Sequence, residues 1–237
     1  MKIQLVTYGN DAYKKQKLLF KEVAESTLLF NSVKIFTPDD LTNGFKAKFS
    51  DILQVPKGGG YWIWKPYIIK ELFDRLSEND ILIYCDAGCL INVNGKERLD
   101  DYIDIIKKSP TGTLAFDLTH EEYKYTKQEV FDYFGCKNEV KTSGQLMGTV
   151  LLFRKCKHSS FLIDTWLKVL YDDPILFTDK RNDIIQHKDF IDHRHDQSIF
   201  SVIRKQYGVA VLPDETWFKN FMVDGKHFPF WATRLKD

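Results

Sequence analysis

The stretch Asp80-Ile81-Leu82-Ile83-Tyr84-Cys85-Asp86-Ala87-Gly88 decides the fold class of this chain. The uninterrupted apolar run is typical of a strand buried on both faces, as in a parallel α/β sheet. Such sheets bind ligands beyond the carboxyl ends of their strands, so Asp86 lies where chemistry is expected. A carboxylate there can hold a divalent cation against the phosphates of a nucleotide, and Gly88 lets the backbone pass close to a ligand. The alternative is an Asp and a Gly that only begin a turn.

The composition limits the class of protein. The chain has 237 residues, 43% apolar and 14% aromatic, which suffices for the core of one α/β domain. With 34 basic and 33 acidic side chains the formal net charge is +1, without the basic excess of a nucleic-acid binder. No stretch approaches the roughly 20 apolar residues of a membrane span, and Met1 to Gly9 is too short for a signal peptide. We expect a soluble, cytoplasmic protein with no nucleic-acid partner and no membrane span.

The cysteines agree with a reducing compartment. No two of them form the C-x-x-C pair of a zinc or redox site. We interpret all four as buried free thiols: Cys85, Cys89, Cys136 and Cys156.

Strand and helix patterns alternate along the chain. Strands are predicted at residues 3–8, 33–36, 80–85, 113–116, 148–154 and 209–212. Helical spacing of apolar residues predicts helices at 12–29, from Lys65-Pro66 to 76, at 99–106 and 162–170, and from about 195 to 207. Residues 120–145 read as short helices and loop covering the sheet edge, and residues 214–237 as loop packed over the site. The order predicts an α/β, Rossmann-like fold with a mostly parallel sheet flanked by helices.

Three segments, in this order and spacing, resemble small bacterial and viral glycosyltransferases of the GT-A fold: Tyr61-Trp62-Ile63-Trp64-Lys65-Pro66, Tyr84-Cys85-Asp86-Ala87-Gly88 and His193-Arg194-His195-Asp196-Gln197-Ser198. The resemblance spans most of the chain. It implies one GT-A domain over residues 1–237, with 120–147 as an acceptor-side insertion and 214–237 as a tail over the site.

The resemblance implies a nucleotide-sugar donor across the carboxyl edge of the sheet. In such enzymes a D-x-D motif holds Mn²⁺ or Mg²⁺ against the diphosphate. Here the motif reads Asp86-Ala87-Gly88, without the second carboxylate. The ion either binds through fewer protein ligands or is dispensable.

The resemblance also assigns residues to the donor nucleotide. Thr7, Tyr8 and Gly9, at the end of the first strand, match the place where base and ribose bind. A strand that merely ends in a glycine turn is the alternative. Arg234, in the tail, could reach the diphosphate, or it is a surface salt-bridge residue.

The Trp-rich segment is a candidate for the phosphate side of the pocket. Lys65 lies just before a helix N-terminus, where a cation and free amides favour phosphate. Trp62 and Trp64 would flank the same pocket. The alternatives are a core position for Trp64 and a solvated surface charge for Lys65.

Two further segments match the part of the family's site that faces the transferred sugar. Gln145 corresponds to an Asn or Gln on that face, and Gly148 allows close approach of the substrate. Asp196 resembles the carboxylate of a D-Q element and could act as a general base toward an acceptor hydroxyl. Its alternative is a helix N-terminal residue stabilised by the dipole. A base at Asp196 or Glu122 favours inversion at the anomeric carbon, whereas a bare amide such as Gln145 favours retention.

Histidines could replace the missing carboxylate. Imidazole ligates Mn²⁺ beside carboxylates, so Asp86, His195 and His227 form the predicted ligand set, with His193 as a further candidate. Taken singly, each histidine is more often structural.

These observations favour a glycosyltransferase that moves a hexosyl or pentosyl group from a nucleotide-sugar, a UDP-sugar first, to a hydroxyl of a glycan or glycoconjugate. Positioning and electrostatic stabilisation of the departing diphosphate would carry catalysis. Two alternatives stay open. One is a metal-dependent nucleotidyltransferase or phosphohydrolase that uses Asp86 and the histidines, and the other is a non-catalytic nucleotide-sugar binding module.

Overall fold

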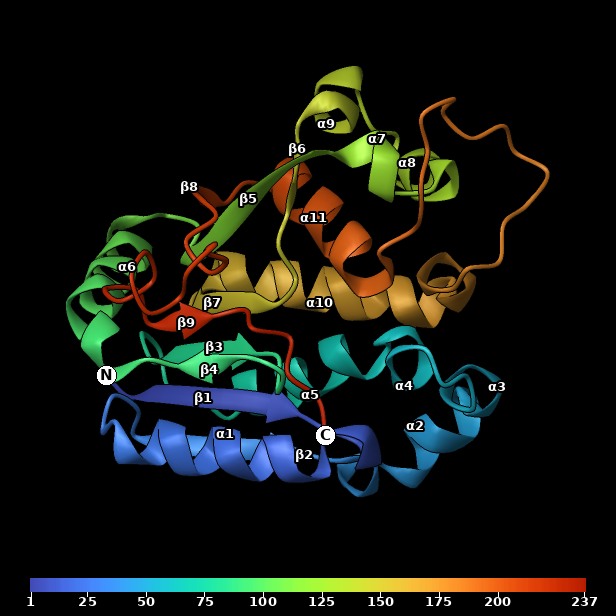
Figure 1. Ribbon diagram of the computed structural model, residues 1–237. Coiled ribbons are helices and arrows are strands. Elements are labelled where there is room, and N and C mark those ends of the chain that lie inside the picture. Colours follow the sequence, from blue (N-terminus) through green and yellow to red (C-terminus); the bar gives the residue numbers. More distant parts are fainter.

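The computed structural model describes residues 1–237, and its centre is a seven-stranded sheet with helices on both faces (Figure 1). The strand order is β2-β1-β3-β7-β5-β6, and β8 pairs with β5. The strands are β1 (Ile3–Tyr8), β2 (Ser32–Phe36), β3 (Ile81–Cys85), β5 (Thr113–Glu121), β6 (Gly144–Leu146), β7 (Val150–Arg154) and β8 (Ala210–Pro213). Strands β6 and β7 run antiparallel to their neighbours, and the other pairings are parallel. The predicted α/β class is confirmed, with these two antiparallel strands inside the sheet.

The central strand β3 is buried on both faces, as its sequence predicts. Ile81, Ile83 and Cys85 pack into one apolar cluster, and Leu82 and Tyr84 pack into the other. The cluster of Leu82 and Tyr84 is covered by α5 (Trp64–Phe73), α10 (Lys157–Asp172) and α11 (His195–Tyr207). The opposite cluster is covered by α1 (Lys14–Ser26) and α6 (Lys96–Lys108). Because neither face meets water, the strand shows no polar alternation.

The largest difference from the predicted elements is in β5, which continues to Glu121 instead of ending at Phe116. Its first part lies between β7 and β8, and its polar second part leaves the main sheet to pair with β6 across a register irregularity. Polar residues hide this extension because they break the apolar run that identifies a buried strand. The predicted short helices follow as α7 (Glu122–Tyr125), α8 (Gln128–Phe134) and α9 (Asn138–Thr142).

Short elements complete the fold around the sheet. The short helical turns are α2 (Asn43–Lys48), α3 (Ser50–Leu53) and α4 (Gly58–Tyr61), of which α4 has a left-handed backbone. Strand β4 (Leu90–Ile91) pairs with β9 (Phe230–Trp231). The 3₁₀ turns are η1 (Asp11–Tyr13), η2 (Pro38–Asp40), η3 (Val93–Gly95) and η4 (Pro174–Phe177).

After β9 the chain crosses back toward β1, and we call residues 232–237 the C-terminal strap (Figure 1). Thr233 Oγ1 and the Leu235 amide both donate to the carbonyl of Gly88, each at 2.9 Å. The Asp237 carboxylate accepts hydrogen bonds from the amides of Lys15 and Gln16 in the first turn of α1. The strap is therefore fixed both to the turn after β3 and to the start of α1.

The composition predicts no membrane span and four buried free thiols. No helix of the structure combines the length and apolarity needed to cross a membrane. All four cysteines are free, and Cys85 and Cys89 are buried, whereas Cys136 and Cys156 are half-buried.

Candidate active site

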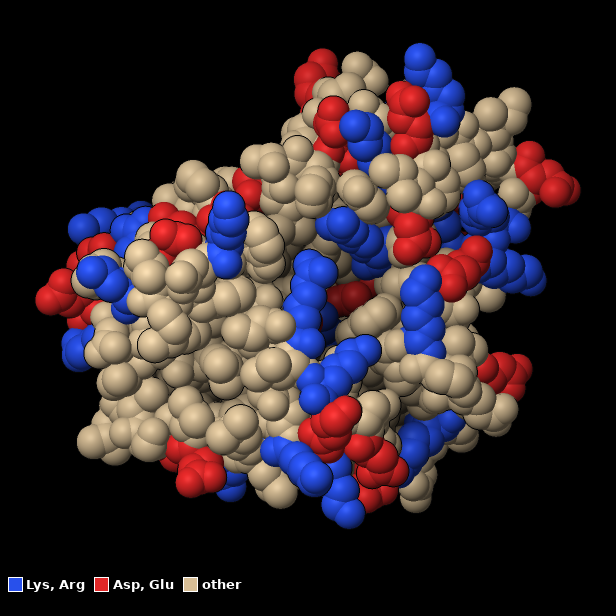
Figure 2. Space-filling model, viewed as in Figure 1, with Lys and Arg blue, Asp and Glu red and all other residues tan.

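The carboxyl edge of the sheet carries the residues that the sequence singles out. Asp86 follows β3 directly, and the bond from the Cys89 amide to the Asp86 carbonyl, 3.0 Å, closes the turn. The Asp86 side chain is 33% exposed. Figure 2 shows a hollow near the middle of the face seen in Figure 1, with basic groups on its sides and an acidic group set deep inside it.

Lys65, in the first turn of α5, connects three parts of this edge. Its Nζ lies 2.7 Å from Asp196 Oδ2 and 3.4 Å from Asp86 Oδ1, and it donates to the Gly148 carbonyl at 3.1 Å. Only 3% of the side chain is exposed. The sequence predicts a direct contact of Lys65 with the diphosphate, but in the structure its ammonium is enclosed by protein groups. The alternative interpretation of Lys65, a solvated surface charge, does not fit this burial either.

Asp196, at the start of α11, is the buried member of the carboxylate pair. Burial raises its pKa to about 6, while Lys65 acts to lower that pKa and Asp86 to raise it. Oδ2 accepts no well-oriented hydrogen bond and has only its ion pair with Lys65. Burial alone would lower the pKa of Lys65, but the two carboxylates outweigh it and raise that pKa. One ammonium thus stabilises two carboxylates, which leaves the cluster short of positive charge when both are ionised.

Asp86 is the member of the pair that a substrate can reach. The hydroxyl of Tyr84 donates to Asp86 Oδ1 at 2.5 Å, and the same oxygen faces Lys65. Burial, and after it the charge of Asp86, raise the pKa of Tyr84 well above its usual range, so the phenol stays a donor. Oδ2 of Asp86 has no partner within the protein. Tyr84 gives no sequence signal for this role, because an aromatic residue in a buried strand reads as core.

Gln145 and Gly148 take places different from those that the resemblance implies. The Gln145 side chain is fully buried; its amide donates to Glu122 at 2.9 Å, and its oxygen accepts from Gln197 at 2.6 Å. Gln197 in turn accepts from the Gly148 amide at 2.9 Å. A Cβ on Gly148 would lie 2.9 Å from that of Gln197, so the glycine is needed for packing against α11. The half-buried side chain of Gln197, and not that of Gln145, bonds to Gly148, whose carbonyl accepts from Lys65.

Glu122 is not available as a base. It is fully buried and accepts from Thr126 and Ser201, each at 2.5 Å, and pairs with Lys205 at 2.6 Å. A carboxylate with this many donors stabilises the packing of α7 against α11. The possibility of Glu122 as the base for inversion is therefore wrong.

The residues at the end of β1 are buried, so they present little surface to a nucleotide base. Thr7 is fully buried, and the ring of Tyr8 stacks on Trp64 with centroids 3.7 Å apart and planes at 15°. Trp64 is itself buried and donates from Nε1 to the Gly58 carbonyl at 3.0 Å, so it takes the core position of its alternative interpretation. All three predicted residues are buried, and the Gly9 amide donates to the Phe36 carbonyl at 3.0 Å.

A left-handed turn leads into α5. All residues from Gly58 to Trp62 have positive φ, and for Tyr61 and Trp62 this costs about 1–2 kcal/mol each. His195, also at positive φ, packs against both rings, with centroids 4.8 Å and 5.5 Å away. Backbone strain of this kind is retained where the surroundings enforce it, often at functional sites. Here the turn fixes the direction in which α5 carries Lys65.

The paired histidines of the D-Q segment are engaged by backbone carbonyls. His195 Nδ1 lies 2.9 Å from the Phe177 carbonyl and Nε2 3.5 Å from Asp179, and His193 Nε2 lies 2.8 Å from the Leu176 carbonyl. Burial, and secondarily the charge of Lys57, lower the pKa of His195 to about 4. Burial lowers the pKa of His193 well below its usual value. Both rings are neutral at neutral pH and anchor the loop before α11.

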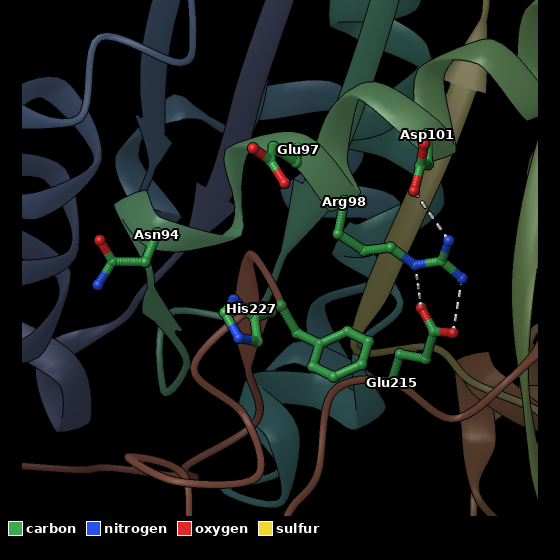
Figure 3. A pocket seen from close by; sticks show the side chains of 7 residues that line it. Asn94, Glu97, Arg98, Asp101, Glu215 and His227 are labelled. Carbon is green, nitrogen blue, oxygen red and sulfur yellow. Dashed lines mark hydrogen bonds and ion pairs between the residues drawn. The ribbon is translucent and has the colours of Figure 1, made fainter.

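His227 lies at a different place, in a surface pocket of about 440 Å³ beside α6 (Figure 3). Figure 3 shows Arg98 bonded to Glu215 and Asp101 at one end of this pocket, and His227 across from the start of α6. The Arg98–Glu215 pair is bidentate, at 2.8 Å and 2.7 Å. Asp86 is not among the residues that line the pocket.

The residues present do not fit a metal site built by the protein. No group of three or more His, Cys, Asp or Glu side chains that could hold an ion occurs in the chain. Mn²⁺ and Mg²⁺ take several oxygen ligands, and the turn after β3 offers one unpartnered carboxylate oxygen, on Asp86. The ammonium of Lys65 already lies between Asp86 and Asp196. The predicted set of Asp86, His195 and His227 is not brought together.

Two arginines near the hollow have no acidic partner. The Arg194 guanidinium lies over the ring of Tyr125, 3.7 Å from its centroid, and reaches the Gln145 oxygen at 3.5 Å. Arg234 is exposed, at positive φ, between the two strap residues that bond to Gly88. Burial lowers the pKa of Arg194, and the nearby charge of Arg234 lowers it further. Sequence analysis missed Arg194, although it lies inside the D-Q segment.

Comparison with known proteins identifies the fold. No protein-family model matches the chain, and no curated protein matches its sequence. A glycosyltransferase involved in glycosylation of the PBCV-1 major capsid superposes with a TM-score of 0.55 at 11% identity, over 98% of this chain and 92% of that one. Mouse xyloside xylosyltransferase 1 gives 0.50 at 12% identity, covering 98% and 97%. The bifunctional glycosyltransferase WbbM gives 0.50 at 11%, covering 91% of this chain and 39% of that one. The chain has the GT-A fold of glycosyltransferases, as its three segments predict.

Proposed function

We propose that this protein is a glycosyltransferase that moves a sugar from a nucleotide-sugar donor to a hydroxyl group of a glycan or glycoconjugate. The observation that carries the proposal is the cluster of Lys65, Asp86 and Asp196 at the carboxyl edge of the sheet, with the Asp86 side chain 33% exposed. In α/β sheets this edge is where ligands bind, and the fold is that of glycosyltransferases.

The donor would lie across the turn after β3. We assign its diphosphate to the turn at Ala87-Gly88 and to Arg234, the adjoining sugar to Asp86, and its base and ribose to the end of β1 at Gly9. UDP is our first choice of nucleotide, and the sugar is a hexosyl or pentosyl group. Residues 120–147 would face the acceptor. The four free thiols are the support for a cytoplasmic location.

The chain's own residues can perform two steps of such a transfer. Asp86, through its unpartnered oxygen, can hydrogen-bond a sugar or acceptor hydroxyl and receive its proton as the new glycosidic bond forms. Tyr84 and Lys65 hold this carboxylate in one orientation, which keeps the reacting groups aligned. Asp196, whose side chain is 6% exposed, acts by positioning Lys65 unless the start of α11 moves. Positive charge beside the departing diphosphate would stabilise the leaving group.

The test is release of nucleoside diphosphate from a panel of UDP-, GDP- and dTDP-sugars, each with an added mixture of glycan acceptors, with and without Mn²⁺. The variant Asp86→Asn should lower the rate by about a hundredfold or more, the contribution typical of a positioned general base. Asp101→Asn, which removes an exposed carboxylate in the pocket beside α6, is the matched control and should retain the rate. Equal rates for both variants would contradict the role of Asp86. Nucleotide-sugar binding without turnover would favour the binding module, and release of pyrophosphate would favour a nucleotidyltransferase.

A further inference from the structure

We propose that the guanidinium groups of Arg194 and Arg234 bind the diphosphate of the donor directly, in the place that a divalent metal would otherwise take. This inference rests on the proposed function and concerns how the same site holds its donor.

The first argument is the ligand set around Asp86. A metal ion here would have one protein ligand, the unpartnered oxygen of Asp86, because Tyr84 and Lys65 engage the other, and it would depend on phosphate oxygens and water for the rest of its ligands. No third metal-ligating side chain joins Asp86 and Asp196. The cation that lies between these two carboxylates is Lys65, but it is enclosed and out of reach of a diphosphate. Positive charge for the diphosphate must come from elsewhere.

The second argument is that neither arginine has an ion-pair partner. Two lysines near this edge already have carboxylate partners: Lys57 pairs with Asp179 at 3.1 Å, and Lys65 pairs with Asp86 and Asp196. The Arg194 side chain makes no ion pair, and its guanidinium has one hydrogen bond, to the uncharged Gln145 at 3.5 Å. Arg234 takes part in no ion pair or side-chain hydrogen bond of the chain. Two neighbouring guanidiniums without an ion-pair partner leave fork-shaped donors free for an anion, and phosphate matches that geometry.

The third argument is where the two side chains are fixed. Arg194 is linked to the cluster through Gln145 and Gln197, since Gln197 bonds both Gln145 and the Gly148 amide. Arg234 is held on the strap by bonds on either side of it to Gly88, two residues beyond Asp86. One arginine therefore comes from the α11 side of the hollow, and the other comes from the strap that crosses the turn after β3.

The positive φ of Arg234 supports a role for its position. A non-glycine residue with φ of 57° in an exposed strap is strained, and the bonds of Thr233 and Leu235 to one carbonyl enforce this conformation. These bonds fix the backbone from which the Arg234 side chain extends.

The experiment is calorimetric binding of UDP, GDP and dTDP to the whole chain, in EDTA and in Mn²⁺. For the nucleotide that binds, we expect the same dissociation constant within about threefold in both buffers. The variants Arg234→Gln and Arg194→Gln should each weaken binding by about tenfold or more, the loss of one charge-assisted hydrogen bond. Arg75→Gln, at a guanidinium paired only with Glu71 on the surface, is the matched control and should bind as the wild type does. Thermal unfolding of each variant checks that the fold is retained.

Each other result overturns the inference in a distinct way. Binding that requires Mn²⁺ and vanishes in EDTA overturns it while leaving the proposed function intact. Binding in EDTA that neither arginine variant weakens overturns the assignment of these residues. Absence of binding by every nucleotide in both buffers overturns the inference together with the proposed function. Arg194→Lys adds a further check, because a retained charge without the planar fork should restore only part of the affinity.

Discussion

Two polar regions of this molecule look alike in composition and differ in how their charges are satisfied. The pocket beside α6 pairs Arg98 with Glu215 in two hydrogen bonds, and the Tyr102 hydroxyl donates to the same carboxylate at 2.6 Å. The cluster beyond β3 sets one buried ammonium, Lys65, against two carboxylates and leaves one carboxylate oxygen without a partner. The volume of a pocket therefore does not identify the site here.

The difference shows what distinguishes a working site from a structural one. In the pocket beside α6, Arg98 pairs with Glu215 and Asp101, and only the exposed Glu97 has no partner, so a ligand of this pair would have to displace an existing bond. In the cluster beyond β3, unpaired carboxylate and guanidinium groups remain available to a substrate. Unsatisfied charge at a strand end is the better indicator of function.

The largest effect is expected from Lys65→Met, which removes the ammonium and keeps a side chain of similar length. Two carboxylates would then lie close together without a counter-charge, and we expect a loss of about 3–5 kcal/mol in the free energy of unfolding. Urea unfolding measures this loss. The double variant Lys65→Met/Asp196→Asn should recover part of the stability, because it removes the buried charge left unpaired. If the single variant is as stable as the wild type, Lys65 does not hold the cluster together.

A smaller effect concerns the pH dependence of stability. Burial raises the pKa of Asp196 from 3.8 to about 6, so the folded protein binds this proton more tightly than the unfolded chain. Stability from this group is therefore present at low pH and falls as the pH rises from about 4 to 6. His195, with its pKa lowered to about 4, acts in the opposite direction over the same range. Because these two contributions oppose each other, the effect of Asp196 is measured by comparing the wild type with a variant that lacks this carboxyl group.

The comparison is urea unfolding of the wild type and Asp196→Asn at several values between pH 4 and 7. The wild type should lose stability relative to the variant as the pH rises through this range. A constant difference between the two proteins would show that Asp196 does not titrate in this window.

In the pocket beside α6, Arg98→Gln should cost about 1–2 kcal/mol of stability, because the pair with Glu215 is only partly exposed. Nucleotide binding and transfer should be unchanged, since this pair is satisfied within the fold. Chemical unfolding and the binding assay together check the result. Loss of binding with retained stability would move the candidate site to this pocket.

The smallest effect on stability is expected from Gly88→Ala. A Cβ at Gly88 would lie 2.9 Å from the Leu235 carbonyl oxygen, so the strap must shift away from the turn after β3. The strap is exposed, so we expect less than about 1 kcal/mol of lost stability. Binding of nucleoside diphosphate should weaken by a factor similar to that of Arg234→Gln. Unchanged binding would show that the strap position does not matter to the donor.

The sequence predicts the fold well because burial leaves a direct pattern. The unbroken apolar run at Ile81 to Tyr84, and the alternation of helical and strand spacing, locate the central strand and the helices on both of its faces. The antiparallel direction of β7 is not predictable in this way, because direction depends on long-range pairing and not on local spacing.

The site is predicted only in part, because the partners of a side chain depend on the tertiary structure. The sequence brings Asp86, Lys65 and Asp196 into one candidate site, and the structure gathers these three. The sequence cannot show that the Gln145 side chain is hydrogen-bonded to Glu122 and Gln197, or that His227 lies beside α6. Arg194 is overlooked because a guanidinium without a partner is recognised only once every possible partner has been located.

The C-terminal strap has a consequence for the rate of turnover. It bonds to the rest of the chain at the Thr216 carbonyl, the Gly88 carbonyl and the first turn of α1, and residues 234–237 are exposed, so we expect this part to open at a lower free energy than the buried sheet. With Arg234 on the diphosphate, the nucleoside diphosphate product would leave when the strap lifts. Departure of product through such a segment sets the turnover number of many enzymes. Variants that loosen the strap would then weaken donor binding and yet shorten the time that the product stays bound.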